Sequence, residues 1–127
     1  MMLKRYVFLA LLPLIFWSTR RVFAQARQPE ATIVVSTLVD ESDGDFSSGD
    51  NSFREAVEQA VNGDTITFDP TLSGSTIVMD GALATLKVEA SITISGNVPI
   101  TLSGGTTTKV LIIGNGPIVD VTIDGLT

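Results

Sequence analysis

The sequence predicts a mostly β protein, a β-solenoid whose N-terminal end is closed by one α-helix. A short amphipathic helix pattern at residues 52–61 is followed almost entirely by strand patterns of three to five residues. The breaks between them lack the two-residue Asn-Gly or Asp-Gly pair of a tight hairpin, with Asp80-Gly81 the nearest exception. Stacked coils need a cover on their open apolar end, and this helix has the chemistry to provide one. A sandwich or a barrel is the alternative.

The first 26 residues have the pattern of a secretory signal peptide. Two basic residues precede an apolar run at 6–17, and small residues at Ala24 and Ala26 offer two cleavage sites. The run is too short to span a bilayer comfortably, although two arginines after it leave an uncleaved anchor open. We expect an exported protein, secreted or on the cell surface, that meets a membrane only through this segment.

The rest of the chain is strongly acidic. All 14 acidic residues lie beyond residue 26, together with only four basic ones, Arg27, Arg54, Lys87 and Lys109. Such a surface repels phosphate backbones, so we expect no nucleic-acid partner. The chain has no cysteine and no histidine. We therefore expect no disulfide, no thiolate metal site and no histidine general base.

The region before the strand-rich part contains three predicted elements. Residues 31–39 are β-branched and roughly alternating, which predicts a strand. Residues 40–50 form an acidic loop. In the helix that follows, Ser52 and Glu55 have the spacing of a capping box, and Asn62-Gly63 predicts a left-handed C-terminal stop. One apolar stripe follows the helix, at Phe53, Ala56, Val57, Ala60 and Val61.

Seven short strands are predicted after the helix. They occupy residues 65–68, 76–79, 86–88, 92–94, 100–102, 110–113 and 119–123. Three of them share a degenerate repeat, apolar-Thr-apolar-polar-Gly, at residues 92–96, 100–104 and 121–125. Short strands of this kind favour stacked coils over a sandwich, whose strands are typically about 5–6 residues long.

The order strand, acidic loop, Ser-Phe-Arg-Glu-Ala helix and Gly-Asp-Thr-Ile-Thr-Phe strand resembles the N-terminal module of exported bacterial proteins called CSLREA-domain proteins. The later rungs at residues 92–96 and 121–127 look like those of pectin-lyase-like right-handed parallel β-helices. The resemblance covers residues 31–127. Asn51 stands where the family motif has cysteine, and Phe53 stands in place of its leucine. The resemblance to these families implies that the chain folds as a right-handed parallel β-helix.

The predicted organisation has three parts: a signal peptide at 1–26, a strand, acidic loop and capping helix at 27–64, and the first coils of the β-helix at 65–127. Members of the family usually run to several hundred residues, and the last rung pattern here reaches Thr127. An open last rung presents unpaired N–H and C=O groups. We therefore expect the chain to be the N-terminal portion of a longer protein.

The acidic loop is the one candidate site for a cofactor, which would be Ca²⁺. Hard oxygen donors suited to calcium stand at Asp40, Glu41, Asp43, Asp45 and Asp50. The spacing departs from an EF-hand, since Phe46 and Ser52 take the places of the loop glycine and the final glutamate. A solvated acidic loop without metal is the alternative.

No catalytic constellation is predicted. Asp120 and Asp124 could pair for glycoside hydrolysis, but Asp124-Gly125 is explained by a turn. A pectate-lyase-like elimination would need an arginine base, and the rungs contain none. Arg54 is expected to form an ion pair with Glu58 and with the acidic loop.

We therefore expect a non-catalytic structural or adhesive module that contacts polysaccharide or other cell-surface components. The alternative is the N-terminal fragment of a carbohydrate-active enzyme, a polysaccharide lyase or hydrolase.

Overall fold

The computed structural model describes residues 30–106, 109–114 and 119–127. The signal peptide predicted at 1–26 lies outside these residues. The described chain is mostly β with one α-helix, as the sequence predicts, and every strand pairing is parallel. Within the described part of the chain, no helix is long and apolar enough to cross a membrane.

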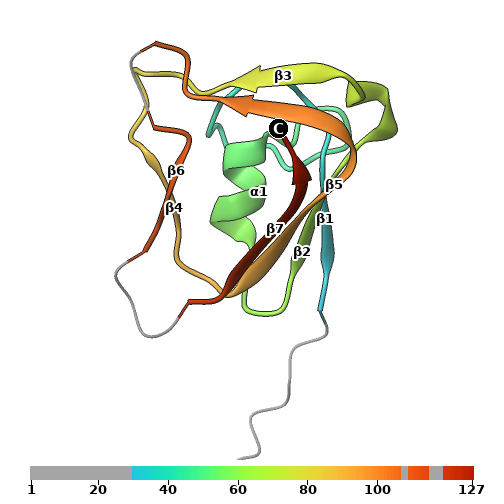
Figure 1. Cartoon of the computed structure of the whole chain (residues 1–127), viewed down its shortest axis with the longest axis vertical. Coiled ribbons are helices and arrows are strands. Elements are labelled where there is room, and N and C mark those ends of the chain that lie inside the picture. The colour runs from blue at the N-terminus through green and yellow to red at the C-terminus, as the bar shows by residue number, and fades with distance from the viewer. Residues whose placement is uncertain (1–29, 107–108, 115–118) are drawn as a thin grey trace, which may run out of the picture.

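Two sheets make up the β structure (Figure 1). The larger has the order β1-β2-β5-β3, with β7 also paired to β5, and the smaller contains β4 and β6. The strands are β1 (Thr32–Val35), β2 (Thr65–Phe68), β3 (Ser75–Val78), β4 (Leu86–Val88), β5 (Ile92–Ser103), β6 (Leu111–Ile113) and β7 (Val121–Leu126). A 3₁₀ turn, η1 (Pro70–Leu72), separates β2 from β3.

A Thr-Ile pair recurs at one register position in four neighbouring strands. Thr32 lies opposite Thr65, Thr65 opposite Thr93, and Thr93 opposite Thr122, and the isoleucine that follows each threonine is aligned in the same way. Adjacent side chains of a strand point to opposite faces. Each isoleucine can therefore enter the interior while its threonine faces outward.

Side-chain hydrogen bonds join residues 29 positions apart, close to the 28 and 29 residues that separate the aligned threonines of β2, β5 and β7. The Ser91 N–H donates to Asn62 Oδ1, and the Asp120 N–H donates to Ser91 Oγ, each across 29 residues. Asn97 spans the same interval, because its amide donates to the Phe68 carbonyl and its Oδ1 accepts from the Phe68 N–H. Parallel strands require long crossover connections, and these bonds join groups at the two ends of such connections.

The predicted break at Gly96-Asn97 is wrong, because β5 runs through it from Ile92 to Ser103. The Asn97 side chain holds this part of the strand against Phe68. A Cβ on Gly96 would lie 2.3 Å from the Gly125 carbonyl oxygen. The glycine therefore allows close approach of two strands rather than ending one.

The helix α1 (Phe53–Gln59) begins as predicted but ends early. The Ser52 side chain accepts from the Glu55 N–H, and the Glu55 carboxylate accepts from the Ser52 N–H, which confirms the capping box. Ala60 is already extended, so Asn62-Gly63 is not the helix stop. Gly63, at a φ of 98°, instead belongs to the turn before β2.

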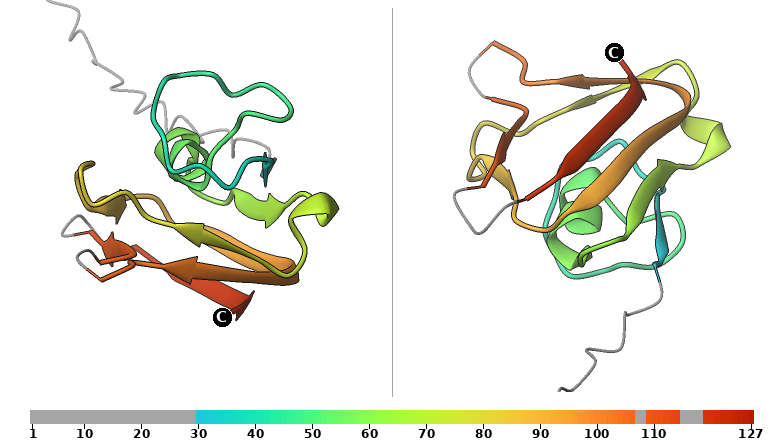
Figure 2. Two further views of the ribbon diagram at one scale, coloured as in Figure 1. Left: turned by 90° about the horizontal axis from the view of Figure 1, so that it is seen from above. Right: turned by 60° about the horizontal axis from the view of Figure 1, so that its bottom comes forward.

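The helix and the acidic loop lie on one side of the strand layers, and the end of β7 lies on the opposite side (Figure 2). Phe53, Ala56 and Val57 are buried, whereas Ala60 is half-buried and Val61 is exposed, so only the first two turns of the predicted stripe face the core. The Phe53 ring stacks on Phe68, with ring centroids 6.0 Å apart. This contact joins the helix to the strands.

Candidate functional site: the acidic loop and the helix

Asp40, the first predicted calcium ligand, is buried and bound to arginine. Arg54 Nε donates to Asp40 Oδ1 at 2.9 Å, and Arg54 Nη2 donates to Oδ2 at 2.8 Å. The Asp80 N–H donates to the same Oδ2, and Arg54 Nη1 donates to the Ala84 carbonyl. The predicted ion pair between Arg54 and the acidic loop is thus confirmed. It ties the loop, the helix and the turn before β4 together.

Glu58 does not take part in that ion pair. Its Oε2 accepts from the Ser42 hydroxyl at 2.8 Å, so it holds a different part of the loop to the helix. The expected pairing of Glu58 with Arg54 is wrong, because the Arg54 guanidinium turns toward buried Asp40, where a bidentate geometry is available.

Glu55 is the buried carboxylate on which the loop closes. Its Oε1 accepts from the Asp43 and Gly44 N–H groups, and its Oε2 accepts from the Ser52 N–H. Burial alone would raise the pKa of Glu55, but these bonds and the Ser52 hydroxyl outweigh it and lower the pKa below its ordinary value. The sequence predicted the role of Glu55 in the capping box. It did not predict that the same carboxylate also binds the loop backbone at Asp43 and Gly44.

Glu41, Asp43, Asp45 and Asp50 remain near the surface of the loop. Burial and the neighbouring Asp50, Asp43 and Glu55 carboxylates raise the pKa of Glu41. Burial, followed by Asp43, Asp45 and Glu55, raises the pKa of Asp50. The carboxylates of the loop are therefore close enough for the charge of one to raise the pKa of another.

Two of the predicted ligands are used within the loop. Asp43 Oδ1 accepts from the Asp45 N–H, and Asp45 Oδ1 accepts from the Ser47 N–H. The Ser47 hydroxyl and N–H lower the pKa of Asp45. Across residues 30–106, 109–114 and 119–127, no three acidic side chains form a group that could hold a metal ion. Calcium binding by this loop stays a prediction.

Asn51, at the position of the family's cysteine, covers the outer edge of β1. Its Nδ2 donates to the Val34 carbonyl, and its backbone carbonyl accepts from the Ser36 N–H. Gln59 Nε2 from the helix donates to Asn51 Oδ1. Sequence reasoning gave Asn51 no role, since only the fold brings Val34 and Gln59 to it. An asparagine directly before the cap residue is the one signal that could have drawn attention to it.

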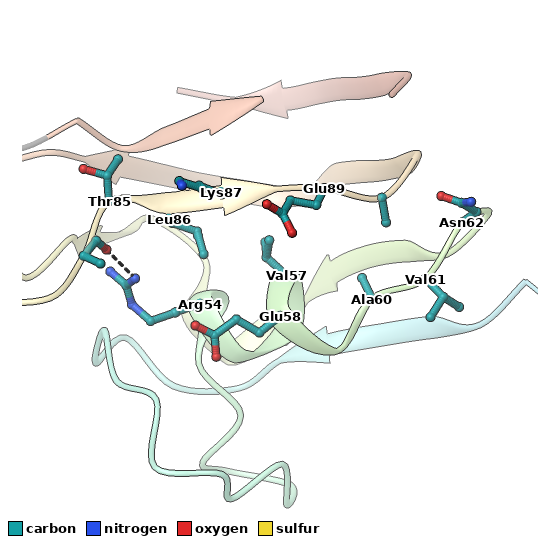
Figure 3. A pocket seen from close by; sticks show the side chains of 12 residues that line it. Arg54, Val57, Glu58, Ala60, Val61, Asn62, Thr85, Leu86, Lys87 and Glu89 are labelled. Atoms are coloured by element: carbon teal, nitrogen blue, oxygen red, sulfur yellow. Dashed lines mark hydrogen bonds between the residues drawn. The ribbon is translucent and has the colours of Figure 1, made fainter. Parts of the chain in front are cut away.

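An open hollow of about 690 Å³ lies between α1 and β4 (Figure 3). Val57 and Leu86 contribute apolar side chains, and Glu58, Lys87 and Glu89 contribute charges of both signs. Arg54 lines it as well, with the Nη1 bond to Ala84 drawn in the figure. The hollow can hold a small polar or zwitterionic molecule by charge, but the side chains around it include no nucleophile paired with a base.

The other carboxylates considered for catalysis lie on the last strand. Asp124 is exposed within β7, opposite Ser95, and not in the turn that the sequence predicted. The register between β5 and β7 shifts directly after Asp124. The strand β7 nevertheless continues through Gly125, which has a φ of 70°. Asp120, also exposed, precedes β7 and bonds through its N–H to Ser91.

No protein-family model matches the chain, and no curated protein and no solved structure matches it either. The resemblance to CSLREA-domain proteins rests on the motifs of the sequence alone. The functional argument therefore depends on the geometry of the described residues.

Proposed function

We propose that residues 30–127 form the capped first coils of a right-handed parallel β-helix. Support comes from the parallel pairing of all the described strands and from the interval of 28 or 29 residues that separates matched positions of β2, β5 and β7. Parallel strands linked within one sheet have right-handed crossovers in about 98% of cases. The second sheet follows the same order, since β4 pairs with β6 in parallel one circuit later.

The proposed role of α1 is to close the first coil. Its buried residues, led by Phe53, cover the apolar interior at Phe68. Asn51 forms hydrogen bonds with the Val34 carbonyl and the Ser36 N–H on the outer edge of β1. Without these bonds, the two backbone groups would be available to pair with another strand. Sealing an end requires both an apolar cover and satisfied edge groups, and this region supplies both.

The proposed function is that of a non-catalytic structural or adhesive module, exported to the cell surface or the secreted space. The observation that carries it is the use of the buried polar side chains. Each binds another part of the described fold, and none lacks a hydrogen-bond partner. These side chains are Asp40, Asn51, Ser52, Arg54, Glu55 and Asp64. A catalytic site would instead leave some of them free to bind a substrate, whereas even Arg54, which lines the hollow beside α1, is bonded to Asp40 and to the Ala84 carbonyl.

The test has two parts. Mass spectrometry of the exported chain is expected to show a new N-terminus after Ala24 or Ala26. The exported chain is then incubated with neutral and acidic polysaccharides, with and without Ca²⁺, while sedimentation measures binding and chromatography measures chain length. We expect binding without shortening of the polysaccharide. Shortened or unsaturated products would establish the enzyme alternative, and loss of these products in Glu58→Gln and Glu89→Gln variants would place that activity in the hollow beside α1.

A further inference from the structure

A second hollow, here called the β1 hollow, lies between β1 and the acidic loop and has a volume of about 630 Å³. Its apolar surface includes Phe46, which is 53% exposed, and Val34, which is 43% exposed. The polar side chains of its lining include Thr32, Ser48, Gln59 and Asp69. Apolar surface with a few convergent polar groups is the usual composition of a ligand site.

Phe46 is the one apolar residue of the acidic loop at 40–50, and both of its neighbours are held by hydrogen bonds. The Asp45 N–H donates to Asp43 Oδ1 at 2.8 Å, and the Ser47 N–H donates to Asp45 Oδ1 at 2.9 Å. The loop therefore presents the ring in a fixed backbone, which lowers the entropy cost of binding a ligand to it.

The polar groups of the β1 hollow, unlike the buried ones, retain unused donors and acceptors. Among the described residues, no hydrogen bond uses the hydroxyl of Thr32 or of Ser48. Gln59 donates through Nε2 and Asp69 accepts through Oδ1, which leaves Gln59 Oε1 and Asp69 Oδ2 available. Hydroxyls both donate and accept, and the two other oxygens accept. This set matches a sugar ring, which has an apolar face of C–H groups and a rim of hydroxyls.

Charge selects the class of glycan. Asp69 is the one charged residue among the described residues that line the hollow. Asp45 and Asp50 lie in the loop that carries Phe46. These carboxylates repel the carboxylate or sulfate groups of an acidic polysaccharide. A neutral polysaccharide meets no such repulsion.

The edge of β1 favours a glycan over a peptide strand. A peptide strand would pair with the outer edge groups of β1, but Asn51 already binds the Val34 carbonyl and the Ser36 N–H. A sugar bound through side chains needs no free backbone ladder.

Thr32, which lines the hollow, also begins a row of threonines across the larger sheet. Thr65, Thr93 and Thr122 are aligned with it on successive strands, and neighbouring strands are about 4.8 Å apart. A chain that lies across the strands therefore meets one threonine on each of them. This row favours a polymer over a single sugar.

We propose that the β1 hollow binds a neutral polysaccharide, with one sugar ring stacked on Phe46 and the chain continuing over the threonine row. The proposal rests on the adhesive role proposed above and adds to it the binding site and the class of glycan. The Thr32 and Ser48 hydroxyls and the free oxygens of Gln59 and Asp69 bind the hydroxyls of the stacked sugar.

Affinity electrophoresis of the full chain, in native gels that contain a soluble polysaccharide, tests the proposal. The neutral probes are hydroxyethyl cellulose, galactomannan and xyloglucan, and the acidic probe is polygalacturonate. We expect at least one neutral polymer to slow the chain and polygalacturonate to leave its migration unchanged. Phe46→Ala is expected to raise the Kd for the neutral polymer by at least about tenfold, whereas Phe46→Trp keeps a flat ring and should stay within about threefold. Val78→Ala is the matched control, because Val78 is also 53% exposed but lies on β3. Its effect is expected to stay within about twofold.

Thr32→Val removes one hydroxyl of the hollow and keeps the branched side chain, so it is expected to raise the Kd about two- to tenfold. It decides the matter if far-UV circular dichroism shows that Phe46→Ala has lost the fold. An unchanged Kd in both variants, or equal weakening by Val78→Ala, would overturn the site and leave the adhesive role standing. Equal binding of polygalacturonate would overturn the neutral class. A parent chain that no polymer slows would contradict both this site and the polysaccharide partner of the adhesive role.

Discussion

The end of the molecule at β1 and α1, here called the covered end, and the end at β6 and β7, here called the open end, are built from the same strand pattern but differ in polar content. The covered end contains four buried polar residues, and each of them is hydrogen-bonded: Asp40, Asn51, Arg54 and Glu55. At the open end, β7 repeats the Thr-Ile pair, and none of the buried polar side chains of the described residues belongs to β6 or β7. Closing a β-stack thus depends on polar groups that satisfy the strand edge and the loop, and not on apolar cover alone.

The largest expected effect is the loss of the arginine at the covered end. Arg54→Ala leaves the Asp40 carboxylate buried without its cation, which typically costs about 3–5 kcal/mol. Urea denaturation monitored by circular dichroism measures the change in the free energy of unfolding. Lys87→Ala, which removes an exposed cation beside the same hollow, is the control and is expected to stay within about 0.5 kcal/mol. Equal losses would show that the ion pair does not stabilise the covered end.

The second comparison is between two isoleucines that lie opposite each other on neighbouring strands. Ile94 in β5 is buried, and Ile123 in β7 is exposed. Ile94→Ala is expected to cost about 2–5 kcal/mol, because it opens a cavity in the core. Ile123→Ala removes the same atoms from an exposed position and is expected to cost less than about 1 kcal/mol. A larger loss from Ile123→Ala than from Ile94→Ala would reverse the assignment of the two ends.

Glu55 links the covered end to pH. Its lowered pKa means that its contribution to stability is present above the pKa of the unfolded chain, about 4.3, and is lost as pH falls through the lower folded value. The raised pKa values of Glu41 and Asp50 act in the opposite sense, since protonation removes the cost of burying their charge and relieves the repulsion between them and the neighbouring carboxylates.

Glu55→Gln is therefore expected to lower the stability at pH 7 by about 1–3 kcal/mol, because one N–H group of the loop or cap meets an amide donor. The difference between variant and parent should shrink as pH is lowered from about 5 to 3. Glu58→Gln, on the exposed side of the same helix, is the control. A difference between Glu55→Gln and the parent that is constant over this pH range would contradict the role assigned to Glu55.

The smallest expected effect concerns Asn51. Asn51→Ala removes the bond to the Val34 carbonyl and the contact with Gln59, at a cost of about 1 kcal/mol. Hydrogen exchange should increase at β1 and leave β5 unchanged. Asn97→Ala is the matched substitution inside the ladder, and there the exchange should increase at Phe68. If both variants changed exchange at the same strand, the separate roles of the two asparagines would be wrong.

The sequence predicted the local features and missed those made by distant residues. The strand patterns at residues 65–68 and 86–88 and the Ser52–Glu55 capping box depend on near neighbours, and the structure confirms them. The Gly96-Asn97 break and the Asn62-Gly63 helix stop were wrong because each depends on a contact about 29 residues away, with Phe68 and with Ser91. The role of Asn51 was hidden for the same reason. The sequence predicted that Arg54 pairs with the acidic loop, but not that its partner is Asp40 or that this carboxylate is buried.

The central claim is that the chain returns to the same register on adjacent strands, and disulfide cross-linking tests it most directly. The chain has no cysteine, so any disulfide comes from an introduced pair. The account predicts rapid oxidation for Thr65→Cys with Thr93→Cys and for Thr93→Cys with Thr122→Cys. Neighbouring strands are about 4.8 Å apart, which suits a disulfide. Thr65→Cys with Thr122→Cys, two strands apart, should stay reduced. Rapid oxidation of that pair, or of none of the three, would contradict the stacked register.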